Sequence, residues 1–323
     1  MRAETSIVKP PLSLLAVALA LGSGCVAMAF EPPGAAERRR AIGSTESLPE
    51  VMRRALAPDE DFRPIPAPSP IDWLAVHAEP GQTFAQFAAS APNRPYAQRR
   101  IIYLQPLGEF PTNQSPSLAQ LRQFAAAYFQ LEVKTLAPME VGAREVTTRI
   151  HPATHKRQLL APDVMDLLKQ KLPADAFCLL GITMADLYPE PSWNFVFGQA
   201  SLRERVGVYS FARYDPAFYG QARTDDYAAL LLRRSCKVLA HETAHLFGLQ
   251  HCIYFDCVIN GSNNLRESDR RPLRLCPVCL RKLQSSIGFD VVKRYEALVK
   301  FYQAAGFADE AQWVHKRLGK LKS

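Results

Sequence analysis

Apolar residues recur along the chain with two different spacings, which predict strands and helices in alternation. Short apolar runs at residues 101–104, 131–133 and 176–183 have the length of buried strands, and residues 194–200 and 206–212 alternate as strands do. Residues 118–129 and 164–172 show helical spacing instead. One face of the first of these helices would carry Leu118, Leu121, Phe124, Ala125 and Tyr128.

A longer helix is predicted from residue 225 to the residues just before Gly248. Acidic residues fill its first turn after Thr224, a candidate N-cap, and neither proline nor glycine interrupts it. Residues 290–304 and 308–318 have apolar helical faces as well. Strands alternate with helices before the long helix, and mostly loops and helices follow it, so we predict an α/β (α+β) fold.

Residues 1–29 are organised like an export signal. Arg2 and Lys9 form a basic start, residues 12–21 are apolar, and Ala27-Met28-Ala29 offers a small-x-small cleavage site. The apolar run is short for a membrane span, so no stable span is expected after cleavage. We therefore expect a periplasmic or secreted protein, with a lipid anchor at Cys25 or a cytoplasmic location as the alternatives.

Residues 30–70 are rich in proline, charge and alanine, which is typical of a linker. We expect ordered structure to begin near Trp73 and one domain to occupy residues 71–323. A chain of 323 residues with 48% hydrophobic composition can bury a core of that size.

The net charge of +8 suggests acidic partners, but the basic residues gather near the ends of the chain. Residues 38–40, 53–54 and 316–322 hold much of the excess, without interleaved aromatic side chains. Solvated charge explains this distribution better than nucleic-acid binding, so no nucleic-acid partner is expected.

The long helix ends in the pattern HExxHxxGxxH, which is typical of a catalytic zinc site. His241 and His245, four residues apart, can aim two imidazoles at one point, and a glycine turn at Gly248 can bring up His251 as a third ligand. Three imidazoles leave the fourth tetrahedral position of zinc open for water. Glu242 is placed to accept a proton from that water as it attacks a carbonyl.

Four of the seven cysteines follow directly. They are Cys252, Cys257, Cys276 and Cys279, and the last two form a CxxC pair. The spacing favours a structural zinc site with four cysteine ligands. Two disulfides or unrelated thiols are the alternatives.

These motifs together resemble the archaemetzincins, a family of metzincin-type zinc peptidases with one catalytic zinc and one structural zinc held by four cysteines. The resemblance covers roughly residues 70–300. Besides the metal motifs, it rests on residues 186–189, 193–200, 208–213, 261–264 and 270–273, which look like the animal-type branch.

The resemblance implies a metzincin-like fold, in which a mixed sheet accompanies the active-site helix. The helical C-terminal part would contain the four-cysteine zinc knuckle (residues 252–279) and helices over residues 288–320. It further implies two zinc ions per chain, a peptide or protein substrate, and zinc-dependent hydrolysis that leans toward aminopeptidase action. Neither the cleaved bond nor the oligomeric state follows from the sequence.

One position departs from the metzincin pattern. Metzincins place a methionine in a tight turn below the zinc, where this chain has Ile259. Because that methionine packs under the imidazoles without binding metal, an isoleucine of similar volume should cost about 1 kcal/mol. The alternative function is a catalytically silent zinc protein that binds peptides or protein partners. Ile259 favours it and the intact Glu242 argues against it.

Two further pairs of residues are not expected to form a functional site. His151 and His155 are four apart, but Pro152 disfavours the helix that would bring them together, so we expect surface residues. Cys178 and Cys236 lie in or beside apolar runs and are expected to be buried thiols.

For the edge of the cleft, we expect residues 194–200 or 206–212 to supply a strand to which an extended peptide can add.

Overall fold

The structure is a computed structural model that describes residues 30–322. The expected export signal at residues 1–29 lies outside this range. Within it, no helix is both long enough and apolar enough to cross a membrane.

The central sheet has five strands in the order β2-β1-β5-β8-β7. These strands are β1 (Ile101–Leu107), β2 (Val133–Thr135), β5 (Ala176–Thr183), β7 (Gly198–Ser201) and β8 (Val206–Ser210). The first four in the order run parallel, whereas β7 pairs antiparallel with β8 and forms one edge. Of the two segments expected to supply the edge strand, residues 194–200 therefore do so, although the observed strand covers only their end and extends to Ser201.

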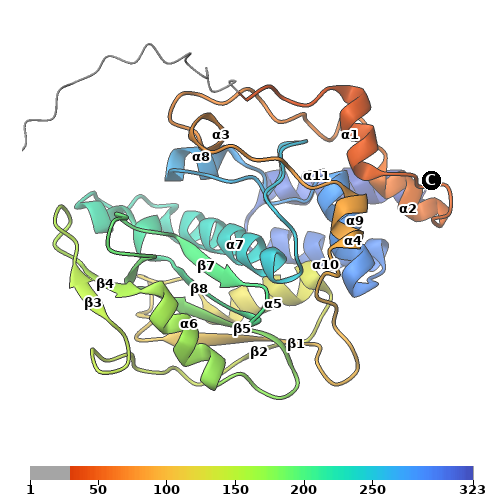
Figure 1. Cartoon of the computed structure of the whole chain (residues 1–323). Coiled ribbons are helices and arrows are strands. Elements are labelled where there is room, and N and C mark those ends of the chain that lie inside the picture. Colours follow the sequence, from red (N-terminus) through yellow and green to blue (C-terminus); the bar gives the residue numbers. More distant parts are fainter. Residues whose placement is uncertain (1–29, 323) are drawn as a thin grey trace, which may run out of the picture.

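Both faces of the sheet are covered, as the continuous apolar runs of β1 and β5 require. Side chains alternate between two cores: Ile102 and Leu104 face the larger core, while Ile101 and Tyr103 face the smaller one. The helices α5 (Leu118–Phe129) and α7 (Tyr227–Leu246) lie on the face of the larger core, and α6 (Ala161–Gln170) packs on the other face (Figure 1).

The C-terminal helices extend the larger core. They are α9 (Pro277–Ile287), α10 (Val291–Ala304) and α11 (Ala308–Lys322), and α10 packs against α5 and α11. Aromatic side chains fill the contact between α5 and α10, where the rings of Phe124 and Phe301 lie 5.4 Å apart. The predicted C-terminal helices are thus part of the same core as the active-site helix.

A second sheet, in the order β3-β4-β6, was not predicted. Its strands are β3 (Thr148–Ile150), β4 (Arg157–Leu160) and β6 (Asp186–Tyr188). These strands are short and carry no regular apolar alternation, so their pairing depends on the folded chain. The short helices η1 (Ala212–Tyr214), η2 (Pro216–Tyr219) and α8 (Leu265–Arg270) complete the middle of the chain.

The expectation that residues 30–70 form a linker is wrong. They contain α1 (Ala35–Ile42) and α2 (Glu50–Leu56), and α3 (Trp73–Val76) and α4 (Phe84–Ala89) follow. Both α1 and α2 contact α9, and their apolar residues join the larger core (Figure 1). The composition misleads here because the apolar residues of the segment are few, yet α1 and α2 pack them against the C-terminal helices.

Ion pairs hold the same segment in place. Arg317 is fully buried and its Nη1 lies 2.6 Å from Asp59 and 3.1 Å from Asp61. Burial alone would raise the pKa of Asp61, but hydrogen bonds from Lys316, Lys320 and Arg317 outweigh burial and hold that pKa well below its usual range. Residues 59–61 are therefore anchored to α11.

The start of the active-site helix also differs from the prediction. The helix begins at Tyr227, with Asp226 rather than Thr224 at the N-cap position and no side-chain cap hydrogen bond. The hydroxyl of Thr224 instead donates to the Asp226 carboxylate at 2.6 Å. The other end follows the prediction, since α7 runs to Leu246 just before Gly248.

Candidate active site

The end of α7 brings the three predicted histidines together. His241 and His245 occupy successive turns, with their ring centroids 4.6 Å apart. Gly248 then adopts φ +89°, a left-handed conformation that favours glycine, and reverses the chain. The ring of His251 consequently lies 5.2 Å from that of His241 and 5.1 Å from that of His245.

Each histidine directs its Nδ1 atom to an oxygen. The acceptors are the carbonyl of Val258 for His241 (2.9 Å), the carbonyl of Leu249 for His245 (2.6 Å) and the Glu79 carboxylate for His251 (2.7 Å). An imidazole that donates from Nδ1 keeps the lone pair of Nε2 for a cation. These hydrogen bonds therefore hold all three rings in the tautomer that a metal needs.

The geometry fits zinc. One nitrogen from each ring lies within 4.8 Å of the others, and Nε2 of His241 and Nε2 of His245 are 3.0 Å apart. Tetrahedral Zn–N bonds of about 2.0–2.1 Å would place two such nitrogens about 3.3 Å apart. Burial lowers the pKa of His245 to about 4 and that of His241 well below its usual value, so both rings are neutral near pH 7.

Glu242, also on α7, lines the same cavity as His241 and His251 and lies against the edge strand β7. A Cβ atom added at Gly198 would lie 2.9 Å from the Glu242 carboxyl carbon, so only glycine leaves this carboxyl its place. Burial raises the pKa of Glu242 to about 8. A cation at the adjacent histidines would lower that pKa and favour the carboxylate.

The position of the metzincin methionine is occupied by a buried residue in a tight turn. Ile259 is fully buried, and the N–H of Asn260 donates to the carbonyl of Cys257 at 3.1 Å. The neighbouring Val258 supplies the carbonyl that accepts from His241. The backbone of this turn therefore supports the first histidine, and the side chain at residue 259 fills the core.

The four predicted cysteines also converge. Their Sγ atoms lie within 4.8 Å of one another, all four are buried, and none of them forms a disulfide. Cys252 Sγ and Cys276 Sγ are 3.6 Å apart, close to the separation of about 3.8 Å that tetrahedral Zn–S bonds of about 2.3 Å produce. Hydrogen bonds from the other three thiols hold the pKa of Cys252 below its usual value. This donor set suits a closed structural zinc site.

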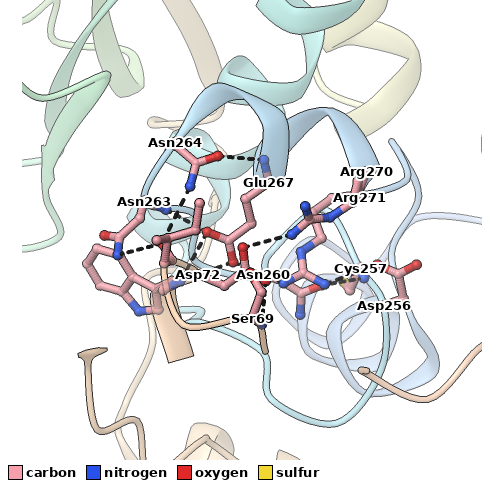
Figure 2. A network of polar contacts seen from close by, with 12 residues as sticks. Ser69, Asp72, Asp256, Cys257, Asn260, Asn263, Asn264, Glu267, Arg270 and Arg271 are labelled. Atoms are coloured by element: carbon pink, nitrogen blue, oxygen red, sulfur yellow. Dashed lines mark hydrogen bonds and ion pairs between the residues drawn. The ribbon is translucent and has the colours of Figure 1, made fainter. Parts of the chain in front are cut away.

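A network of polar contacts connects residues 260–271, which follow the turn at Ile259, to residues 69–73 of the N-terminal segment (Figure 2). The fully buried Glu267 accepts from the backbone N–H of Trp73 at 3.0 Å and from Arg271 at 3.2 Å. Asp72 accepts from Arg270 at 2.8 Å. These contacts fix Trp73, whose ring lies 5.2 Å from that of His251 and whose Nε1 donates to Glu79 at 2.8 Å.

Sequence reasoning missed Glu79 and the role of Trp73. Glu79 lies 172 residues before His251, outside any motif, and no local pattern marks it. It also missed Lys237, which is one turn before His241 and lines the cavity beside Glu242. The spacing of four residues from His241 could have drawn attention to Lys237, because such residues share a helix face.

The two residue pairs that were set aside take no part in this site. His151 is buried rather than exposed, and its Nδ1 accepts from the backbone N–H groups of Ala153 and Thr154 in a turn. The expectation of a surface residue is wrong for His151, whereas His155 is exposed. Cys178 and Cys236 are buried thiols as predicted, and burial raises the pKa of both.

The fold and the histidine centre are those of a zinc metallopeptidase: a mixed α/β domain whose helix carries two histidines and a glutamate, followed by a third histidine. Comparison with known proteins agrees. The model of peptidase family M54 matches residues 144–285. Archaemetzincin-2 of Homo sapiens is 43% identical over 279 residues, which cover 78% of each chain. Archaemetzincin-1 of Homo sapiens is 36% identical over 261 residues, covering 72% of this chain and 52% of the relative.

This chain belongs to the archaemetzincin family. Among solved structures, the archaemetzincin from Methanopyrus kandleri is 27% identical, with a TM-score of 0.46 and coverage of 59% of this chain and 97% of that chain. A zinc-dependent peptidase from Methanocorpusculum labreanum is also 27% identical, with a TM-score of 0.47 and coverage of 56% and 99%.

Proposed function

We propose that this chain hydrolyses peptide bonds at the centre formed by His241, His245 and His251, with Glu242 as the general base. The observation that carries the proposal is the orientation of the rings: each Nδ1 is engaged by an oxygen, and the three histidines converge beside one carboxyl. A purely structural site would close around the cation, whereas this one borders a cavity of about 180 Å³.

Two zinc ions are part of the proposal. The three histidines would hold one ion, and Cys252, Cys257, Cys276 and Cys279 would hold the other. At the histidine centre, zinc supplies a Lewis acid that lowers the pKa of water and polarises a carbonyl group.

Glu242 moves the proton. Its carboxylate accepts a proton from the water that attacks the scissile carbonyl, and then passes the proton to the leaving amine nitrogen. Gly198 leaves room for this carboxylate on the cavity side of β7. The surrounding low-polarity walls, including Val196, Phe197 and Val238, exclude competing water.

The edge strand β7 offers a binding surface for an extended peptide. Among the strands of the described chain, β8 is its only hydrogen-bonded neighbour in the sheet, so the other edge of β7 can pair with substrate backbone. Gly198 on this strand touches Glu242, so a peptide bound along β7 would pass the general base.

Aminopeptidase action is one form of this proposal and endopeptidase action is the other. Matched peptides with free and acetylated amino termini distinguish them.

The test uses the full chain with its zinc, beside Glu242→Gln and His241→Ala/His245→Ala. We expect a peptide library to be cleaved by the wild type, and Glu242→Gln to lose about 10²–10⁴-fold in kcat while keeping its zinc. Elemental analysis should give two zinc ions per wild-type chain and one in the double-histidine variant. The proposal would be contradicted if Glu242→Gln cleaved peptides at the wild-type rate, or if the histidine changes left the zinc content unaffected. Peptide binding without any cleavage by the wild type would support the silent zinc protein instead.

A further inference from the structure

The cavity beside Glu242 extends along α7, away from the histidine centre. Its volume is about 180 Å³, and Val238 and Phe197 form part of its apolar wall. Its lining also includes Lys237, Ser268 and Arg271, and Lys237 lies one helical turn before His241. A substrate side chain that enters next to Glu242 would therefore meet both apolar walls and cationic groups.

Lys237 is buried, with 6% of its surface exposed. It lies four residues before His241, so its Cα is about 6 Å from that of His241 along the helix axis and on the same face. Its Nζ donates one hydrogen bond, to the carbonyl of Ser268 at 2.6 Å. Because an ammonium group has three donors, two remain for another partner.

The carboxylates around Lys237 are already paired with arginines. Glu310 pairs with Arg233 and Arg274, and Asp269 pairs with Arg234. In the part of the chain that the structure describes, Lys237 forms no ion pair. Burial lowers the pKa of Lys237 to about 8, with Asp269 and Glu310 opposing the shift and Arg233 and Arg234 adding to it. The amine therefore stays mostly protonated at neutral pH, although it lacks a carboxylate.

Arg271 also lines the cavity and has a donor without a partner in the described part of the chain. Its Nη2 contacts Glu267 at 3.2 Å and its Nη1 lies 3.6 Å from Asp256, but its buried Nε has no hydrogen-bond partner among the described residues (Figure 2). A buried cationic donor without a partner is costly, and a ligand carboxylate would relieve that cost at both residues.

We propose that Lys237, assisted by Arg271, makes this cavity a subsite for a carboxylate carried by a substrate residue next to the cleaved bond. The proposal rests on the proposed peptidase function. The carboxylate comes either from an aspartate or glutamate side chain or from the carboxyl terminus of a short peptide. Both sources offer the same two oxygens to the amine, and the apolar walls strengthen the contact by excluding water.

The test compares peptides within one protein. The full chain carrying Glu242→Gln, loaded with zinc, is titrated with matched pairs of peptides in calorimetry. One pair has glutamate or glutamine before the cleaved bond, and a second pair has glutamate or glutamine after it. The peptides of a third pair end at the residue after the cleaved bond, with a free or an amidated carboxyl terminus. The cleavable bond is the one that active wild type cuts in the same peptides. We expect the acidic member of at least one pair to bind about 10–100-fold more tightly, the worth of one charge-assisted hydrogen bond.

Substitutions of Lys237 identify the residue responsible. In the same protein, Lys237→Met should reduce the preference to about one, Lys237→Arg should retain most of it, and Lys293→Met, an exposed lysine on α10, should leave it unchanged. Because the preference is a ratio measured on one sample, a partly unfolded fraction does not alter it. Lys237→Gln serves if Lys237→Met does not fold.

The outcomes separate the subsite from the peptidase. Equal binding of acidic and neutral peptides in every pair overturns the subsite, and so does a preference that persists in Lys237→Met. If the wild type cleaves neutral peptides in that case, the proposed function stands. If acidic peptides bind more tightly in a Lys237-dependent manner but the wild type cleaves none, only the proposed function fails. Failure of all peptides to bind overturns the subsite.

Discussion

Oε1 of Glu79 lies 2.7 Å from Nδ1 of His251, although 172 residues separate the two in the sequence. Trp73 adds a hydrogen bond from its Nε1 to the same oxygen, and its ring packs edge-on against His251. Hydrogen bonds to His251 and Trp73 outweigh burial and lower the pKa of Glu79, so it is a carboxylate at neutral pH. The N-terminal segment thus orients a candidate metal ligand that lies far from it in the sequence.

Loss of this carboxylate should weaken metal binding. We expect Glu79→Ala to bind zinc at the histidine centre about 10–100-fold less tightly, because His251 would no longer be held with Nε2 toward the metal. Glu79→Asp should recover part of the affinity. Competition with a chromophoric chelator measures both. Glu46→Ala, an exposed carboxylate in the same N-terminal part, is the control. Unchanged affinity in Glu79→Ala would show that the carbonyl contacts at His241 and His245 suffice.

The close approach of β7 to Glu242 predicts a second effect. In Gly198→Ala the new Cβ would lie 2.9 Å from the Glu242 carboxyl group, so that group must move. We expect kcat/KM for peptide cleavage to fall about 10²-fold, since a displacement of about 1 Å costs that much, while zinc content stays the same. In Gly319→Ala the added Cβ meets no atom within 4 Å, which makes it the matched control. Equal activity of Gly198→Ala and wild type would contradict the assigned position of Glu242.

The cysteine cluster should contribute stability rather than catalysis. We expect Cys279→Ser to lose one zinc per chain and to unfold more easily, by about 4 kcal/mol where free zinc exceeds its Kd about 1,000-fold. Zinc at the histidine centre should remain, because the ligands of the two clusters are separate. Thermal unfolding with elemental analysis checks both statements. Cys236→Ala, a buried thiol outside the cluster, should keep the wild-type zinc content. A wild-type zinc content in Cys279→Ser would refute the structural site.

The ion pairs of residues 59–61 predict an acid-dependent contribution to stability. Because the folded protein holds the pKa of Asp61 below its unfolded value, the contribution is present above pH 4 and is lost as the pH falls through the lowered pKa. Asp61→Asn should therefore reduce the free energy of unfolding at pH 7, and the difference from wild type should shrink between pH 5 and pH 2. Urea unfolding at several pH values measures it. A difference that is constant with pH would mean that the carboxylate charge is not what matters.

Local features of the sequence determined the donor groups of the candidate site. His241, His245, Gly248 and His251 lie within eleven residues, so helical geometry and one glycine turn are enough to bring the imidazoles together. The long apolar periods also determined α5 and β5, whose observed bounds match the predicted residues. These features are local, and their physical causes lie in residues that are close in the chain.

Tertiary structure decided what depends on distant partners. The helices α1 and α2 form within a proline-rich segment because α9 and the other C-terminal helices cover their apolar sides. The short strands β3, β4 and β6 exist because they pair with one another. Folding alone places Glu79 beside His251, and it leaves Lys237 without an ion pair among the described residues. No pattern within a few residues records such neighbours, because burial and charge pairing are set by contacts that folding alone creates.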